Sequence, residues 1–92
     1  MNRLVGTQIT RIVLDVLKPH EPPIQDLASK LASLRGIDRA SVSLAEIDQS
    51  TESVKVSIEG TGIAFDSVRK VLEELGAVIH SIDEVSVAKK TR

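Results

Sequence analysis

The sequence predicts an α+β fold of the ferredoxin-like type, in which strands and helices follow the order β-α-β-β-α-β. Segments with alternating apolar residues, typical of strands, flank two segments whose apolar residues recur at intervals of three and four, typical of helices. Both helical segments end at a glycine, so the two halves of the chain share one plan. The 92 residues therefore form a single domain over 1–92, with an ordered core expected over about 8–88.

The first half of the chain predicts a strand over residues 8–18 and a helix over residues 23–36. Pro19 ends the strand because proline lacks the N–H group that a ladder needs. Gly36 suits the left-handed position that follows a helix. The apolar face of the strand consists of Ile12, Leu14 and Val16, and that of the helix of Ile24, Leu27, Leu31 and Leu34.

The second half predicts two more strands, over residues 37–48 and 54–60, which a short polar connection joins as a hairpin. A second helix is predicted over residues 65–76 and a last strand over residues 77–87. The apolar pattern of the last strand changes phase near Asp83. This change indicates a β-bulge at that point.

Right-handed crossovers arrange these strands as an antiparallel sheet of order 4-1-3-2, with both helices on one face. The other face has no partner within the chain, and strands two and four are open edges that invite pairing. We therefore expect a homo-oligomer, closed into a ring where the contacts are head-to-tail. The uncovered face is expected to mix apolar with polar residues: Val13, Leu17, Ala45, Ile47 and Ile79 with Arg11, Lys55, Ser57 and Glu59.

The composition excludes several classes of function. With no cysteine, the chain has neither disulfides nor thiolate metal sites. A net charge of −1 and a single aromatic residue give no basic surface or stacking platform for nucleic acid. No apolar run approaches the ~20 residues that span a bilayer, so we expect a cytoplasmic protein with no membrane partner. No nucleophile–base pair or cofactor motif is visible, so an enzyme is not expected.

In the predicted topology, three segments meet at one end of the sheet: the loop 18–23, the hairpin tip 48–53 and the start of the last strand, 77–80. Carboxylates and imidazoles on loops are ligands for divalent cations; calcium and magnesium prefer oxygen, whereas zinc accepts two histidines and a carboxylate. The ionisable residues at this end are His20, Glu21, Asp48, Glu52 and His80, with Asp15 and Glu46 slightly further along the strands. Asp38, Asp66, Asp83 and Glu84 are predicted at the opposite end.

Each of these residues also has a purely structural interpretation. Acidic residues in turns commonly face solvent or bend the chain. His20 lies in an exposed loop between prolines, where it can bind a ligand or simply shape the turn. His80 alternates with Val78 and Ile82, which favours a histidine at the edge of the core that makes one hydrogen bond; an earlier bulge would instead turn it toward Asp15.

Three segments resemble the signature blocks of a small, largely archaeal family known as domain of unknown function 211. They are RIVLDVLKPHEP (11–22), LAEIDQSTESVKVSIEG (44–60) and GAVIHSIDEV (76–85). The resemblance implies a ferredoxin-like domain in cyclic homo-oligomers, with calcium or another divalent cation at the acidic blocks, and it implies no activity. The matching candidate ligands are Asp15, His20, Glu21, Glu46, Asp48, Asp83 and Glu84.

Two functional hypotheses follow. The first is a homo-oligomeric binding module that holds a divalent cation or a small anion near the loop end or at subunit boundaries. The second is a regulatory domain that binds a small metabolite between subunits, and it rests on analogy with other domains of this fold.

Overall fold

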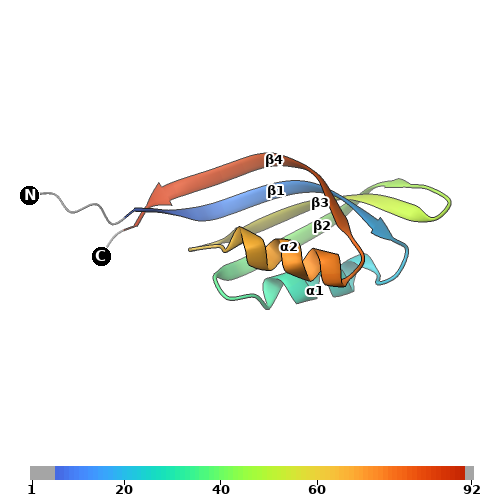
Figure 1. Cartoon of the computed structure of the whole chain (residues 1–92), viewed down its shortest axis with the longest axis horizontal. Helices are drawn as coiled ribbons and strands as arrows, with labels where there is room; N and C mark the ends of the chain where they lie inside the picture. The colour runs from blue at the N-terminus through green and yellow to red at the C-terminus, as the bar shows by residue number, and fades with distance from the viewer. Residues whose placement is uncertain (1–5, 91–92) are drawn as a thin grey trace, which may run out of the picture.

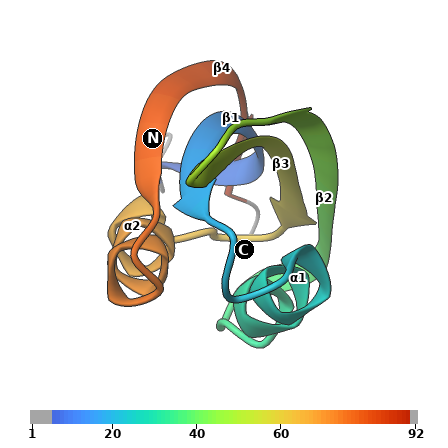
Figure 2. The same ribbon diagram turned by 90° about the vertical axis from the view of Figure 1, so that its right-hand side faces the viewer.

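The computed structural model of the protein describes residues 6–90 and confirms the predicted fold class. The elements are β1 (Thr7–Pro19), α1 (Ile24–Ala32), β2 (Ile37–Ile47), β3 (Thr51–Gly60), α2 (Phe65–Glu74) and β4 (Val78–Lys89) (Figure 1). The strands form one antiparallel sheet of order β2-β3-β1-β4, which is the predicted order read from the other edge. Both helices lie on the same side of this sheet (Figure 2). No helix within residues 6–90 is long and apolar enough to cross a membrane.

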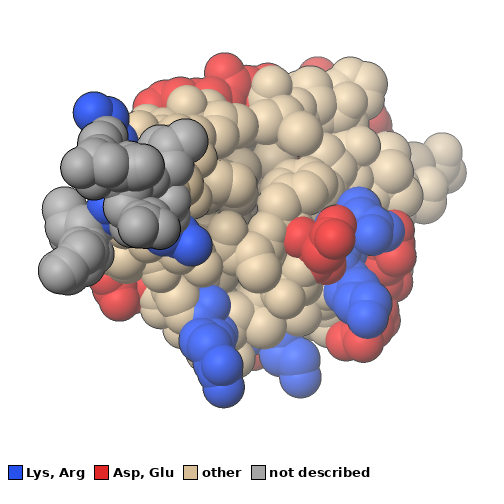
Figure 3. All heavy atoms as spheres, turned by 60° about the vertical axis from the view of Figure 1, so that its left-hand side comes forward, with Lys and Arg blue, Asp and Glu red and all other residues tan. Residues whose placement is uncertain are grey.

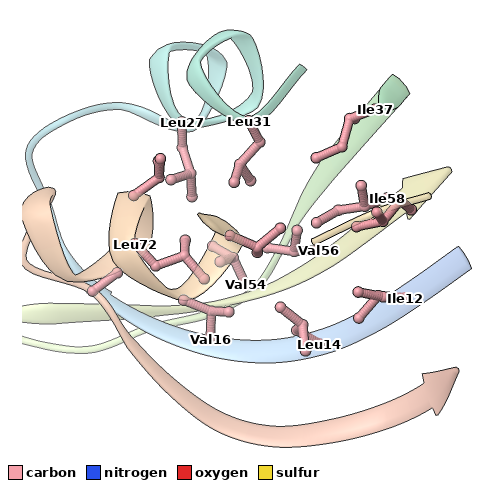
Figure 4. Close-up of a cluster of buried hydrophobic side chains, with 14 residues drawn as sticks. Ile12, Leu14, Val16, Leu27, Leu31, Ile37, Val54, Val56, Ile58 and Leu72 are labelled. Carbon is pink, nitrogen blue, oxygen red and sulfur yellow. The ribbon is translucent and has the colours of Figure 1, made fainter. Parts of the chain in front are cut away.

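The hydrophobic core fills the space between the sheet and the two helices. Because alternate residues of a strand face opposite sides, each central strand contributes three side chains to it. Those of β1 and β3 point toward the leucines of the helices (Figure 4). Burial of each aliphatic side chain contributes about 1.5–3 kcal/mol, so this layer is the main source of stability. The side chains are Ile12, Leu14, Val16, Val54, Val56, Ile58, Leu27, Leu31, Val68 and Leu72, with Ile37, Ile63, Val71 and Ala77 around them.

Two glycines bring the turn after α1 against the turn before α2. The helix α1 ends at Ala32, four residues earlier than predicted, and its chain reverses through Gly36, which has φ +87°. The Gly36 carbonyl accepts a hydrogen bond from the Thr61 N–H at 2.8 Å. A β-carbon on Gly60 would collide with the Gly36 carbonyl oxygen. Gly60 is therefore required by this close approach of two backbone segments.

The strand β4 carries two β-bulges rather than one. The predicted bulge at Asp83 is confirmed, since Leu14 pairs with Ile82 and Val13 with Glu84. A second irregularity skips His80, so that Ile79 and Ile82 face the same side of the sheet. The prediction that His80 shares a face with Ile82 is therefore wrong, and the alternative, an earlier bulge that turns His80 toward Asp15, is the arrangement found. The placement of Ile79 on the uncovered face is also wrong, because Ile79 packs against the core.

The β2–β3 hairpin is longer than predicted. Its ladder continues to the pair Ile47–Glu52, and the Asp48 N–H closes the tip by donating to the Thr51 carbonyl at 2.8 Å. Glu52 therefore lies in a strand, opposite both Ile47 and Lys18. Because Lys18 is buried on the helix side, Ile47 belongs to that side as well and not to the uncovered face.

Candidate functional site

The three segments predicted to meet at one end of the sheet do so. Lys18 is paired with Glu52 across β1 and β3, and Leu17 is paired with Val78 across β1 and β4. The loop after β1, the hairpin tip and the start of β4 therefore lie side by side. This end of the molecule contains both an ionic network around a buried lysine and an open hollow.

Lys18 is the centre of the ionic network. Its side chain is 1% exposed, which makes it the one buried charged residue within residues 6–90. The ammonium group donates to Glu52 Oε1 at 3.0 Å and to the carbonyls of Pro19 and His20 at 2.7 and 3.3 Å. All three N–H groups therefore have acceptors, which offsets much of the free-energy cost of removing the charge from water.

His20 extends this network to the hairpin tip. Its Nδ1 lies 3.0 Å from Glu52 Oε2, and its Nε2 lies 3.0 Å from the Gln49 carbonyl oxygen. The hydrogen bond to Glu52, followed by that to Gln49, raises the pKa of His20 above its usual value. The pKa of Glu52 is lowered by the hydrogen bonds from His20 and Lys18. Since both ring nitrogens face acceptors, His20 has no free nitrogen to give a metal ion.

The sequence pattern indicates neither the burial of Lys18 nor the role of Glu52, because polar alternation marks both as surface residues.

An open hollow of about 320 Å³ lies on the uncovered face of the sheet. Asp15, Glu46 and His80 contribute its ionisable groups, and Leu17 and Ser53 line it as well. His80 is exposed here rather than at the edge of the core, because the second bulge of β4 turns it toward this face. The side-chain hydrogen bonds and ion pairs found within residues 6–90 do not include Asp15, Glu46 or His80.

The remaining candidate ligands lie elsewhere. Asp83 and Glu84 are in the middle of the uncovered face rather than at the opposite end, and they form ion pairs with Lys55 at 3.7 Å and Arg11 at 3.1 Å. Glu21 and Asp48 are exposed in the loop and at the hairpin tip. Within residues 6–90, no three His, Asp or Glu side chains lie close enough together to hold a metal ion.

Exposed apolar side chains gather on the two edge strands. Large hydrophobic residues that are at least 39% exposed are Leu44 and Ile47 on β2, Val78, Ile82, Val85 and Val87 on β4, and Leu17 on β1. Ile82 and Val85 face the helix side, because their ladder partners Leu14 and Ile12 are in the core. They remain exposed because β4 rises away from α2 (Figures 1 and 2).

The charged side chains are unevenly distributed over the surface. A broad area without charged side chains occupies the middle of the view in Figure 3, and the acidic and basic side chains lie at its margins. The exposed apolar residues of the edge strands are the evidence for an interface, because clustered apolar surface more often marks one than isolated exposed residues do.

Comparison with known proteins identifies the family of the chain. A family model described as "Uncharacterized ArCR", domain of unknown function 211, matches residues 10–91. The chain belongs to this family. An uncharacterized protein of Methanocaldococcus jannaschii is 56% identical over 82 residues, which are 89% of this chain and 84% of the relative. The resemblance of the three sequence segments to the domain of unknown function 211 family is thereby confirmed.

Proposed function

We propose that this member of the domain of unknown function 211 family is a homo-oligomeric binding module. Its copies join edge to edge, with β2 of one copy against β4 of the next. The observation that supports this is the exposure of Ile47, Ile82 and Val87, which is 60, 52 and 54% in a single copy. Their removal from water would contribute about 25 cal/mol per Å² of apolar area.

The strand directions support the same arrangement. Within the sheet β2 is antiparallel to β3, β3 to β1, and β1 to β4, so β2 and β4 run in opposite directions. A second copy that places its β2 along β4 therefore extends the antiparallel sheet and keeps its helices on the same side. Such a contact uses two different surfaces, so repeated copies close into a ring when the rotation allows it. The even balance of charged residues suits a module of the cytoplasm.

Native mass spectrometry of the purified protein tests the assembly. We expect several copies per particle, and fewer copies in Ile82→Lys and Leu44→Lys, because a charge at the contact would have to be buried. Leu17→Lys is the matched control, since Leu17 is 39% exposed but lies on the central strand β1. A monomeric wild-type protein refutes the proposal, and loss of assembly in Leu17→Lys alone would place the contact on the uncovered face.

The chain contains no cysteine, so engineered cysteines report the contact directly. A mixture of Leu44→Cys and Val85→Cys proteins should be linked by a short bifunctional maleimide. Each variant alone should remain unlinked, because a head-to-tail contact brings β2 only against β4. Efficient linking of Val85→Cys to itself would contradict the head-to-tail arrangement.

We propose in addition that the hollow beside Asp15 binds a divalent cation such as calcium. Its two carboxylates, Asp15 and Glu46, are oxygen ligands of the type that hard cations take, and His80 lines the same hollow. Water or groups of a neighbouring copy would complete the coordination, since calcium takes six to eight oxygens.

Thermal unfolding with and without calcium tests the cation site. Bound cation stabilises the folded state, so calcium should raise Tm of the wild-type protein. The double variant Asp15→Asn with Glu46→Gln should lose this rise, whereas the control Asp66→Asn on α2 should keep it. An unchanged Tm with calcium, magnesium and manganese refutes the cation site and leaves the proposed assembly unaffected.

A further inference from the structure

The side chain of His20 is held between two different parts of the fold. Its own loop follows β1, Glu52 belongs to β3, and Gln49 lies at the tip of the β2–β3 hairpin. The ring is thus the link between the β1–α1 loop and the hairpin tip, with both contacts at 3.0 Å.

Both groups that face the ring are hydrogen-bond acceptors. The Gln49 partner is a backbone carbonyl, and Glu52 is a carboxylate that also accepts a hydrogen bond from Lys18 at 3.0 Å. A neutral imidazole carries one N–H group and an imidazolium carries two. Only the imidazolium can therefore donate to Glu52 and Gln49 at the same time, whichever tautomer the neutral ring adopts.

We infer that His20 is a proton-operated clamp that fastens the hairpin tip to the β1–α1 loop. In the protonated ring, both contacts are hydrogen bonds and the tip is held. In the neutral ring, one nitrogen presents a lone pair to an acceptor, so one contact is lost and the other is weakened. The contact to Gln49 is the one released, because a carboxylate is a stronger acceptor than a carbonyl and keeps the single N–H of the neutral ring on Nδ1.

The surroundings of the ring set the direction of the pH response. The charged groups that face it are Glu52 on β3 and Lys18 on β1, and the hairpin contributes the neutral carbonyl of Gln49. The carboxylate stabilises the imidazolium, and the ammonium group opposes it from behind that carboxylate. The clamp is therefore closed while Glu52 is ionised and His20 is protonated, and it opens as pH rises through the raised pKa of His20.

Nuclear magnetic resonance measures both halves of this inference in the wild-type protein. The carbon-bound ring protons of His20 report its titration, and the amide signal of Asp48, which donates to the Thr51 carbonyl, reports the state of the tip. We expect the midpoint of His20 to lie higher in the folded protein than in the same protein unfolded in concentrated urea. The tip amide should change at that same midpoint and lose protection against hydrogen exchange above it, after correction for intrinsic exchange.

Two variants complete the test. His20→Ala should leave the tip unprotected at every pH, and its exposed position makes a folded variant expected. His80→Ala, the matched control, removes the other histidine and should leave the response of the tip unchanged. Three outcomes would each overturn the inference. His20 could titrate at the same midpoint in folded and unfolded protein, the tip amide signal could stay unchanged while His20 titrates, or the pH response could persist in His20→Ala. None of these outcomes depends on the proposed assembly or cation site.

Discussion

Lys18 and Glu52 lie directly opposite each other on β1 and β3, with 3.0 Å between Nζ and Oε1. The lysine is 1% exposed and the glutamate 17%, so the pair is largely shielded from solvent on the helix side of the sheet. Water screens such a pair less than a surface pair. The pair connects the end of the central strand β1 to the hairpin and provides the carboxylate to which His20 binds.

The first prediction concerns the two halves of this pair. Glu52→Leu leaves a buried ammonium group without its counter-ion and should lower Tm more than Lys18→Met, which replaces the buried charge with an apolar chain of similar length. Thermal unfolding followed by circular dichroism measures the difference in Tm. A larger loss in Lys18→Met would show that the carbonyl contacts of Lys18, rather than its charge pair, hold this end together.

The second prediction is a window of pH in which the network stabilises the fold. The pKa of His20 is raised from its usual 6.5, so its contribution is complete below that value and is lost as pH rises through the raised pKa. The pKa of Glu52 is lowered from its usual 4.5, so its contribution is complete above that value and is lost as pH falls through the lowered pKa. Tm measured against pH should therefore decline on both sides of this window.

Variants separate the two limbs of that profile. His20→Ala should flatten the decline at higher pH, while His80→Ala should retain it. A profile of His20→Ala that superimposes on the wild-type profile would show that His20 does not contribute to stability.

The third prediction concerns the close approach of the two turns. Gly60→Ala places a β-carbon against the Gly36 carbonyl and should cost about 1–3 kcal/mol, as overpacking of a rigid site does. Gly62→Ala is the control, because its nearest neighbour is a side-chain oxygen at 3.6 Å, so that only its φ of +69° contributes a cost, of about 1–2 kcal/mol. Chemical denaturation of both variants measures these values. Equal losses would mean that the turns separate without penalty.

The fourth prediction follows from the proposed assembly and needs no variant. Association stabilises the folded state by mass action, so Tm should rise with protein concentration. Ile82→Lys should remove this dependence while Leu17→Lys retains it. Calorimetry at a series of concentrations provides the measurement, and a Tm independent of concentration in the wild type would argue against assembly.

The sequence predicts the fold well because the two apolar periods are clear in it. Ile12, Leu14 and Val16 alternate as a strand with one buried face must, and the structure places them in the core. Gly36 and Gly76 mark the turns after the helices, where both have positive φ. The helix α1 ends earlier than predicted because Ser33 caps it before Gly36 is reached. The Ser33 hydroxyl donates to the Lys30 backbone carbonyl at 2.7 Å.

The candidate site is less accessible to sequence reasoning, for two physical reasons. A β-bulge changes which face of the sheet the following side chains point to, and no particular residue type marks its position. The direction of the His80 side chain therefore depends on one skipped pairing. In addition, burial of Lys18 depends on the length of the hairpin, which brings Glu52 into the ladder opposite it. The pairing register between strands that are distant in the sequence cannot be predicted from local composition or periodicity.

The bulges of β4 have a consequence for how this strand can vary. His80 and Asp83 are surplus to the ladder, so every other residue of β4 keeps its side of the sheet whether or not they are present. Deletion of either residue would shorten the strand and leave the row of Ile79, Ile82, Val85 and Val87 intact. An insertion at any regularly paired position would instead turn each side chain beyond it to the opposite face of the sheet. These two positions are where β4 tolerates a change in length, and where new side chains can be introduced beside the sheet without redesigning its edge.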